Sequence, residues 1–218
     1  CGIVLRSQDM HSMKFSDNLM CISRAGVGVN NIPVDDCSEK GIVVFNTPGA
    51  NANAVKELVI AGMLLASRNI IAGSYWANSL EGDITQQVEK GKSRFKGREI
   101  KGKTVGVIGL GGIGVPVVNA CVQLGMNVIG YDAYLSVKNA LHLSKHATVV
   151  DKLDDMLPLC DYLTVHVHAN EETNGMINEE VIGKMKDNSV LLNFARNSIV
   201  DVSAVASALK SGKLCRYV

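Results

Sequence analysis

The sequence lacks any excess of charge of one sign. Its 22 lysine and arginine residues are balanced by 21 aspartate and glutamate residues, which leaves a formal net charge of +1. This balance produces no overall field that would attract nucleic acid or an anionic membrane surface. Internal repeats and low-complexity segments are also missing. We therefore expect neither nucleic acid nor a membrane as a partner.

Long apolar runs and paired cysteines are missing too. The longest strongly apolar run covers residues 58–66, whereas a membrane-spanning helix needs about 20 apolar residues. No basic segment precedes an apolar one at the start of the sequence, so a signal peptide is not predicted. The six cysteines are scattered, without a CxxC pair, which favours reduced thiols over disulfides or a zinc site. These features predict a cytoplasmic protein.

The apolar and turn patterns predict an α/β fold. Strand-like runs at residues 2–5, 20–23 and 42–45 alternate with helical segments at residues 16–19 and 34–40, and this alternation is typical of parallel strands. A core-facing helix is expected over residues 53–69 because its apolar residues recur at intervals of three and four. Residues 79–103 are polar and contain a run of lysines and arginines. Because the pattern of this segment is irregular and no aromatic residue apart from Phe95 is interleaved with its charges, a solvated connector is favoured there over a nucleic-acid arm.

A second α/β unit begins at Thr104. We expect strands at residues 104–108, 127–131, 162–166 and 190–194, and a helix at residues 114–124. The organisation predicted from these patterns is a partial domain over residues 1–50 and a second domain over residues 51–218. Both ends of the chain are abrupt and typical of strands, so a truncated sequence is expected.

The strongest chemical motif is the glycine pattern GLGGIG at residues 109–114. It follows an apolar strand, opens a helix, and is followed by a strand that ends at Asp132. In a dinucleotide-binding motif, Gly109 permits the tight turn, Gly111 lets the pyrophosphate approach the backbone, and Gly114 lets the helix pack closely. The helix N-terminus attracts the phosphates, and Asp132 accepts hydrogen bonds from the ribose hydroxyls. Because a 2′-phosphate would meet this negative charge, NAD is predicted rather than NADP.

Arginines follow three of the predicted strands. Arg6 and Arg24 each come just after a strand, so both are expected at the carboxyl edge of one parallel sheet, where they could bind a doubly charged anion. Arg24 opens the segment RAGVGVNN (residues 24–31), in which the N–H groups of Val27 and Gly28 are expected to form an anion-binding nest. Arg196 follows the strand at residues 190–194 and could hold a carboxylate and polarise a carbonyl oxygen.

Several segments together resemble the D-isomer-specific 2-hydroxyacid dehydrogenases over essentially the whole sequence. The segments that carry the resemblance are RAGVGVNN (24–31), NTPGAN (46–51) followed by VKE (55–57), KTVGVIGLGGIG (103–114), DYLTVH (161–166) and NFAR (193–196) followed by IVD (199–201). Several motifs in the right order are far more specific than any one of them. Within this family the chain is most like the D-3-phosphoglycerate dehydrogenases.

The resemblance implies a fold, a reaction and site residues. It implies two Rossmann-like or flavodoxin-like domains with parallel sheets, residues 1–50 being a partial substrate-binding domain and residues 51–218 the NAD-binding domain, in a homodimer. The implied reaction is oxidation of a small phosphorylated 2-hydroxy acid, 3-phosphoglycerate, on the route to serine. It assigns the substrate phosphate to Arg6, Ser7 and Arg24, and catalysis to Arg196. The cofactor contacts that it implies are Val27, Gly109, Gly111, Gly112, Ile113, Gly114, Asp132, Val167, Phe194, Ala195 and Arg196.

The sequence departs from the family pattern in three places. His168 stands where the family usually has proline, and Asn197 where it has glycine. The family's catalytic histidine and glutamate lie beyond the last residue, so we expect this chain to bind NAD and to turn over very slowly. No third ligand lies near His166 and His168, and no metal site is predicted.

Two other functions remain open at this stage. One is a related dehydrogenase for an unphosphorylated acid such as glycerate, lactate or formate. The other is a non-catalytic NAD-sensing protein, because corepressors share this fold and the fold alone does not fix the function. The response of phosphorylated and unphosphorylated substrates to loss of Arg6 distinguishes the first of these from the phosphoglycerate reading.

Overall fold

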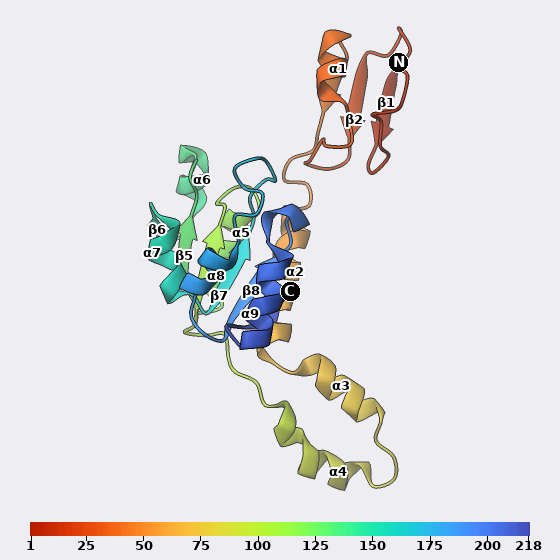
Figure 1. Cartoon of the computed structure of the whole chain (residues 1–218). Helices are drawn as coiled ribbons and strands as arrows, with labels where there is room; N and C mark the ends of the chain where they lie inside the picture. Colours follow the sequence, from red (N-terminus) through yellow and green to blue (C-terminus); the bar gives the residue numbers. More distant parts are fainter. The chain divides into compact units, whose positions relative to one another are not determined.

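The computed structural model describes all 218 residues, and the chain divides into two compact units, Cys1–Asn53 and Ala54–Val218. Both units are α/β with parallel strands, as the sequence predicts. Figure 1 labels most of the helices and strands of both units.

The first unit contains a three-stranded parallel sheet in the order β1-β2-β3. Its elements are β1 (Gly2–Leu5), β2 (Cys21–Arg24), α1 (Val34–Glu39) and β3 (Val43–Phe45). A small core that includes Met10, Ile22, Ile32 and Cys37 lies against the sheet. The buried Met10 fixes the long loop between β1 and β2 to this core, and that loop carries Arg6.

The helix predicted at residues 16–19 is wrong. These residues form turns instead, with the Leu19 N–H donating to the Ser16 carbonyl at 2.9 Å. The Ser16 hydroxyl also accepts a hydrogen bond from the Asn18 N–H. A segment of four residues is too short to offset the cost of helix nucleation, and the serine side chain offers the backbone a competing partner.

The second unit is built on a six-stranded parallel sheet in the order β6-β5-β4-β7-β8-β9. The strands are β4 (Thr104–Ile108), β5 (Asn127–Tyr131), β6 (Ala147–Val150), β7 (Tyr162–Val165), β8 (Ser189–Asn193) and β9 (Leu214–Tyr217). In chain order this is 3-2-1-4-5-6, the doubly wound arrangement that binds dinucleotides where the strand order reverses. That reversal lies between β4 and β7.

Five of the eight helices named next cover the two faces of this sheet. The helices are α2 (Ala52–Ser67), α3 (Ile70–Asn78), α4 (Ile84–Gly91), α5 (Gly114–Gln123), α6 (Val137–His142), α7 (Leu153–Met156), α8 (Glu179–Lys184) and α9 (Val202–Ser211), with short 3-10 turns η1 (Lys92–Phe95), η2 (Leu157–Leu159) and η3 (Asn197–Ile199). One core joins α2 and α5 to the sheet, and the other joins α7, α8 and α9 to it. Because the central strands are buried on both sides, they are almost entirely apolar.

Alternate residues of β7 belong to opposite cores. Tyr162 packs with α2 and α5, and Leu163 packs in the other core. The buried Tyr162 hydroxyl lies 2.6 Å from the Ser67 hydroxyl, which also donates to the Met63 carbonyl. A buried hydroxyl needs such a partner, so this bond fixes the end of α2 to the central strand.

The connector predicted at residues 79–103 is partly helical, and the prediction of an irregular segment is wrong for α4 and η1. Asp83 caps α4, its carboxylate accepting the Gln86 N–H at 3.0 Å. This aspartate is a helix-start signal that the basic residues of the segment obscured. Trp76 of α3 stacks on Phe95 of η1 at 4.9 Å between ring centroids, with the Arg94 guanidinium over the Trp76 ring, so α3 packs on η1.

No single helix of this chain is long and apolar enough to cross a membrane. By length and composition only, α2 and α3 would pass that test as a pair, bent by 67° at their junction. All six cysteines are free thiols.

Candidate cofactor site and anion-binding loops

The glycine turn lies at the carboxyl ends of three neighbouring strands of the second unit. The Gly109 N–H donates to the Tyr131 carbonyl at the end of β5, and the His166 N–H donates to the Ile108 carbonyl at the end of β4. Gly109 has φ +89°, and a Cβ there would lie 2.8 Å from the His166 carbonyl group. Only glycine is compatible with this turn, which lies at the reversal of strand order.

The next residues leave an open, donor-rich surface. The backbone N–H groups of residues 111–114 have no acceptor in the chain, and no side chain caps α5. A Cβ added to Gly111 or Gly112 would meet nothing within 4 Å, whereas a Cβ on Gly114 would collide with the Gly109 carbonyl oxygen. Free N–H groups at a helix N-terminus, without side chains in front of them, match a pyrophosphate.

Asp132 follows β5 directly and lies against the glycine turn. Its carboxylate accepts the Leu110 N–H at 2.7 Å through one oxygen and the Tyr134 N–H at 2.8 Å through the other. Each oxygen keeps a further lone pair for a ribose hydroxyl. The donors of the turn and the acceptors of Asp132 therefore fit the two polar parts of NAD.

Arg196 follows β8, the strand next to β7. The Asn193 side chain accepts the Ala195 N–H and donates to the Arg196 carbonyl, both at 3.0 Å, so it fixes the turn that carries the arginine. The exposed Arg196 guanidinium makes one hydrogen bond, to the Ala195 carbonyl, and pairs with no carboxylate of the chain. It therefore remains available to an anionic ligand.

The three apolar residues predicted at the cofactor lie around the same strand ends. Val167 follows β7, and its Cγ1 atom would lie 3.0 Å from a Cβ on Gly109. The Phe194 ring lies against Gly62 of α2, where a Cβ would come within 3.2 Å of it. Ala195 packs against the core that contains α9. The contacts of these three residues with NAD stay predictions.

His166 is the one strongly perturbed titratable group near the turn. Burial lowers its pKa from 6.5 to about 4, because desolvation disfavours the charged imidazolium. Its Nε2 atom lies 3.0 Å from the hydroxyl of the fully buried Thr164. The folded protein therefore holds a neutral imidazole directly beneath the glycine turn.

Replacing His166 with glutamine is expected to make the free energy of unfolding depend less on pH between pH 6.5 and 4. The pKa of His166 is lower in the folded protein, so the unfolded chain binds more protons between pH 6.5 and 4. The contribution of His166 to the free energy of unfolding is therefore fully present above pH 6.5 and is lost as the pH falls towards 4. This contribution is on the order of 3 kcal/mol. Urea unfolding of both proteins from pH 7 to 4 measures it. His146→Gln, at an exposed position, is the control, and parallel wild-type and His166→Gln profiles would contradict the prediction.

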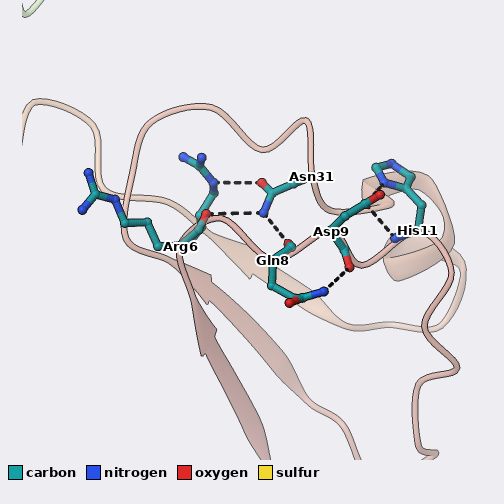
Figure 2. Close-up of polar contacts among 6 residues, drawn as sticks. Arg6, Gln8, Asp9, His11 and Asn31 are labelled. Atoms are coloured by element: carbon teal, nitrogen blue, oxygen red, sulfur yellow. Dashed lines mark hydrogen bonds and ion pairs between the residues drawn. The ribbon is translucent and has the colours of Figure 1, made fainter.

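In the first unit, Arg6 and Arg24 lie at the carboxyl ends of adjacent strands. Leu5 pairs with Arg24 across β1 and β2, and Arg6 and Ser7 follow immediately. Arg6 and Ser7 are exposed, with no side-chain hydrogen bond, while Arg24 is half-buried. Figure 2 shows the Arg6 side chain extended and unpaired beside the polar contacts of Asn31. The two arginines therefore share one edge of the sheet, as predicted.

The loop after β2 is held by hydrogen bonds from two residues that follow β3. The Asn46 side chain donates to the Val27 carbonyl at 2.9 Å, and the Thr47 N–H donates to the Gly26 carbonyl. The N–H groups of Val27 and Gly28 have no acceptor in the chain. This geometry is compatible with the predicted anion nest, and the binding of an anion there stays a prediction.

Sequence reasoning missed three asparagines that hold these loops, namely Asn31, Asn46 and Asn193. All three lie inside the quoted motifs and carry no charge. Their only signal in the sequence is an amide next to a strand end or a glycine loop, where such side chains often bind the backbone. Their partners became visible only in the fold.

Comparison with known proteins identifies relatives over nearly the whole chain. Residues 60–218 match the family model described as the D-isomer specific 2-hydroxyacid dehydrogenase, NAD binding domain. The D-3-phosphoglycerate dehydrogenase of Methanocaldococcus jannaschii is 40% identical over 199 residues, covering 91% of this chain and 36% of that protein. The hydroxypyruvate reductase of Thermotoga maritima is 38% identical over 200 residues, covering 90% and 60%. The solved structure of Rhodotorula graminis D-mandelate dehydrogenase matches with a TM-score of 0.81 and 26% identity, covering 93% and 59%.

The doubly wound sheet, the glycine turn and Asp132 define a Rossmann-type NAD-binding domain of an oxidoreductase class. More specifically, the chain belongs to the D-isomer specific 2-hydroxyacid dehydrogenase family. It spans well under half the length of the phosphoglycerate dehydrogenase from Methanocaldococcus jannaschii.

Proposed function

We propose that this chain is part of an enzyme that oxidises 3-phosphoglycerate to 3-phosphohydroxypyruvate with NAD, a step towards serine. The observation that carries the proposal is the pair of arginines, Arg6 and Arg24, at adjacent strand ends of the first unit. Two guanidinium groups suit a phosphate dianion better than a neutral hydroxyl. Phosphoglycerate dehydrogenases among the relatives support the same substrate.

Each part of the chain then has a distinct task. Residues 1–50 contribute to substrate binding, with Ser7 beside Arg6 and with Val27 and Gly28 offering N–H donors to an anion. The second unit holds NAD, which when bound accepts a hydride from the substrate. Arg196 binds the substrate carboxylate and stabilises the carbonyl as it forms. The proton of the hydroxyl group passes to a general base, which by resemblance to the family is a histidine.

Arg6→Ala is expected to impair the reaction of a phosphorylated substrate and to leave that of an unphosphorylated one nearly unchanged. Loss of charge-assisted hydrogen bonds to phosphate should raise the KM for 3-phosphoglycerate by about tenfold to a hundredfold, while kcat/KM for glycerate changes less than about twofold. NADH formation by the intact protein measures both. Lys14→Ala, which removes the same charge from an exposed position of the same unit, is the matched control. Equal losses with both substrates would refute the phosphate role of Arg6.

A second candidate is an enzyme for an unphosphorylated 2-hydroxy acid. The Thermotoga maritima hydroxypyruvate reductase, which is nearly as similar as the phosphoglycerate dehydrogenases, favours it. In that case the wild-type protein would use glycerate at least as well as 3-phosphoglycerate. A non-catalytic NAD-sensing protein would bind NAD and form no NADH with either substrate.

We also propose that two copies of the chain associate through the second unit. Helices α2 and α3 expose large apolar side chains, among them Leu58, Leu64, Leu65, Ile70, Ile71 and Tyr75. Large exposed apolar side chains gathered on two consecutive helices are typical of a protein–protein interface.

Sedimentation equilibrium of this chain should therefore give twice its mass of 23.3 kDa. Ile71→Glu should shift the protein to the monomer, because a buried unpaired carboxylate is costly. The control is Leu141→Glu on α6, whose side chain is 80% exposed. A monomeric wild-type chain, or a dimer unaffected by Ile71→Glu, would contradict this arrangement.

A further inference from the structure

Asn31 makes more contacts with the proposed anion site than any other uncharged residue there. Its side-chain oxygen accepts the Arg24 Nε–H at 2.9 Å. Its side-chain nitrogen donates to the Gln8 carbonyl at 2.7 Å and to the Arg6 carbonyl at 3.4 Å. Figure 2 shows the Asn31 amide at the centre of these contacts. One amide therefore links the loop of Arg6 to the side chain of Arg24.

The Asn31 backbone strengthens the same link. Its carbonyl accepts the Met10 N–H at 2.9 Å, and the Met10 side chain is buried in the core of the first unit. The loop after β1 is thus fixed at three points by one residue that lies more than 20 positions away in the sequence. The geometry of this loop, and with it the position of Arg6, therefore depends on Asn31.

Gly26 fixes the other side of the Arg24 guanidinium. A Cβ at this position would collide with Nη1 of Arg24, so the guanidinium lies directly over the Gly26 backbone. The Arg24 Nε–H donates to the Asn31 side chain, and the two Nη groups of Arg24 have no acceptor in the chain. The guanidinium is therefore held in one orientation with its two terminal nitrogens free, which is the edge that binds a phosphate with two parallel hydrogen bonds.

We propose that Asn31 is a positioning residue that aligns Arg24 with Arg6 for the substrate phosphate. The inference rests on the proposed function, because it takes the anion of this site to be the phosphate of 3-phosphoglycerate. Asn31 acts through Arg24 and does not itself touch the ligand. An arginine that is already ordered loses less side-chain entropy when it binds, so the alignment raises affinity for the phosphorylated substrate alone.

The test combines a binding measurement with a double-mutant cycle. Calorimetric titration of the intact protein, saturated with NADH so that no turnover occurs, gives the Kd for 3-phosphoglycerate and for glycerate. Asn31→Ala should weaken 3-phosphoglycerate by about tenfold and leave glycerate and NADH within about twofold. In an Arg24→Lys background, which has no Nε–H to hold, Asn31→Ala should have little further effect. The matched control is Asn30→Ala, at the adjacent exposed asparagine, whose side chain makes no hydrogen bond.

A second readout needs no ligand. The ¹⁵N relaxation of the Arg24 Nε–H group should indicate an ordered side chain in the wild type and in Asn31→Asp, which keeps an acceptor for it, and a mobile one in Asn31→Ala. This comparison also separates positioning from a general loss of folding, because Asn31→Asp gives up the bond to Gln8 and keeps the bond to Arg24.

Three results would overturn the inference: an Arg24 signal unchanged by Asn31→Ala, an equal affinity loss in the Arg24→Lys background, or the same loss in Asn30→Ala. A wild-type protein that binds 3-phosphoglycerate no better than glycerate would instead overturn the proposed substrate. In that case the ¹⁵N relaxation of the Arg24 Nε–H group would still test the role of Asn31.

Discussion

In the intact protein, replacing Arg196 with alanine is expected to lower kcat/KM by roughly three orders of magnitude, with little effect on folding. The exposed guanidinium contributes only one hydrogen bond to the fold, to the Ala195 carbonyl. Its removal therefore leaves the protein stable, while the substrate loses the charge that binds its carboxylate and stabilises the forming carbonyl. Arg196→Lys should recover part of the activity, because lysine keeps the charge and loses the bidentate geometry.

The chain offers a closely matched control in Arg216. Its Nη1 atom donates to the carbonyl of the preceding residue, Cys215, at 2.7 Å, just as Nη1 of Arg196 donates to Ala195. Arg216→Ala removes the same charge and the same kind of hydrogen bond, and it should retain full activity in NADH-forming steady-state assays. Arg196→Ala activity within tenfold of the wild type, or an equal loss in Arg216→Ala, would refute the catalytic role.

Substitutions within the glycine turn are expected to have the second largest effect, on NADH binding. Gly114→Ala places a Cβ on the Gly109 carbonyl oxygen, so the turn and the start of α5 must move apart. We expect the NADH Kd to rise by about a hundredfold or more, since several hydrogen bonds to the pyrophosphate are lost together. The melting temperature should fall as well, because the collision is with backbone atoms.

Alanine substitutions at Gly111 and Gly112 distinguish effects on cofactor binding from effects on folding. A Cβ meets nothing within 4 Å at either position, so both alanine variants should melt like the wild type. Gly111→Ala should nevertheless lose NADH affinity by about tenfold or more, because its Cβ occupies the approach of the pyrophosphate. Gly112 stands at a position of the motif where other residues are allowed, and its alanine variant should bind NADH nearly normally. Fluorescence titration with NADH and thermal unfolding measure both properties, and an unimpaired Gly111→Ala variant would contradict the assignment of the turn.

The α/β fold and the chemistry of the second unit could be predicted from local patterns. A glycine at a positive-φ turn, a glycine where a helix begins, and an aspartate after the next strand are requirements of single backbone positions. Such requirements are recorded in residue type and spacing, and the structure places Gly109, Gly114 and Asp132 together at the end of the sheet. The errors lay in weakly patterned segments, such as residues 16–19 and α4, where capping and turn bonds decide the conformation.

By itself, the sequence determined that the chain has parallel α/β units, a dinucleotide turn and arginines at strand ends, because these depend on local periodicity and on individual residues. The tertiary structure alone decided which strand ends are neighbours and which polar side chains find distant partners. The Ser67–Tyr162 bond joins residues 95 positions apart, and Asn31 reaches Gln8 across 23. Since a hydrogen-bonding amide carries no trace in the sequence of the partner that it will meet, the hold of Asn31 on Arg24 became visible only when the chain was folded.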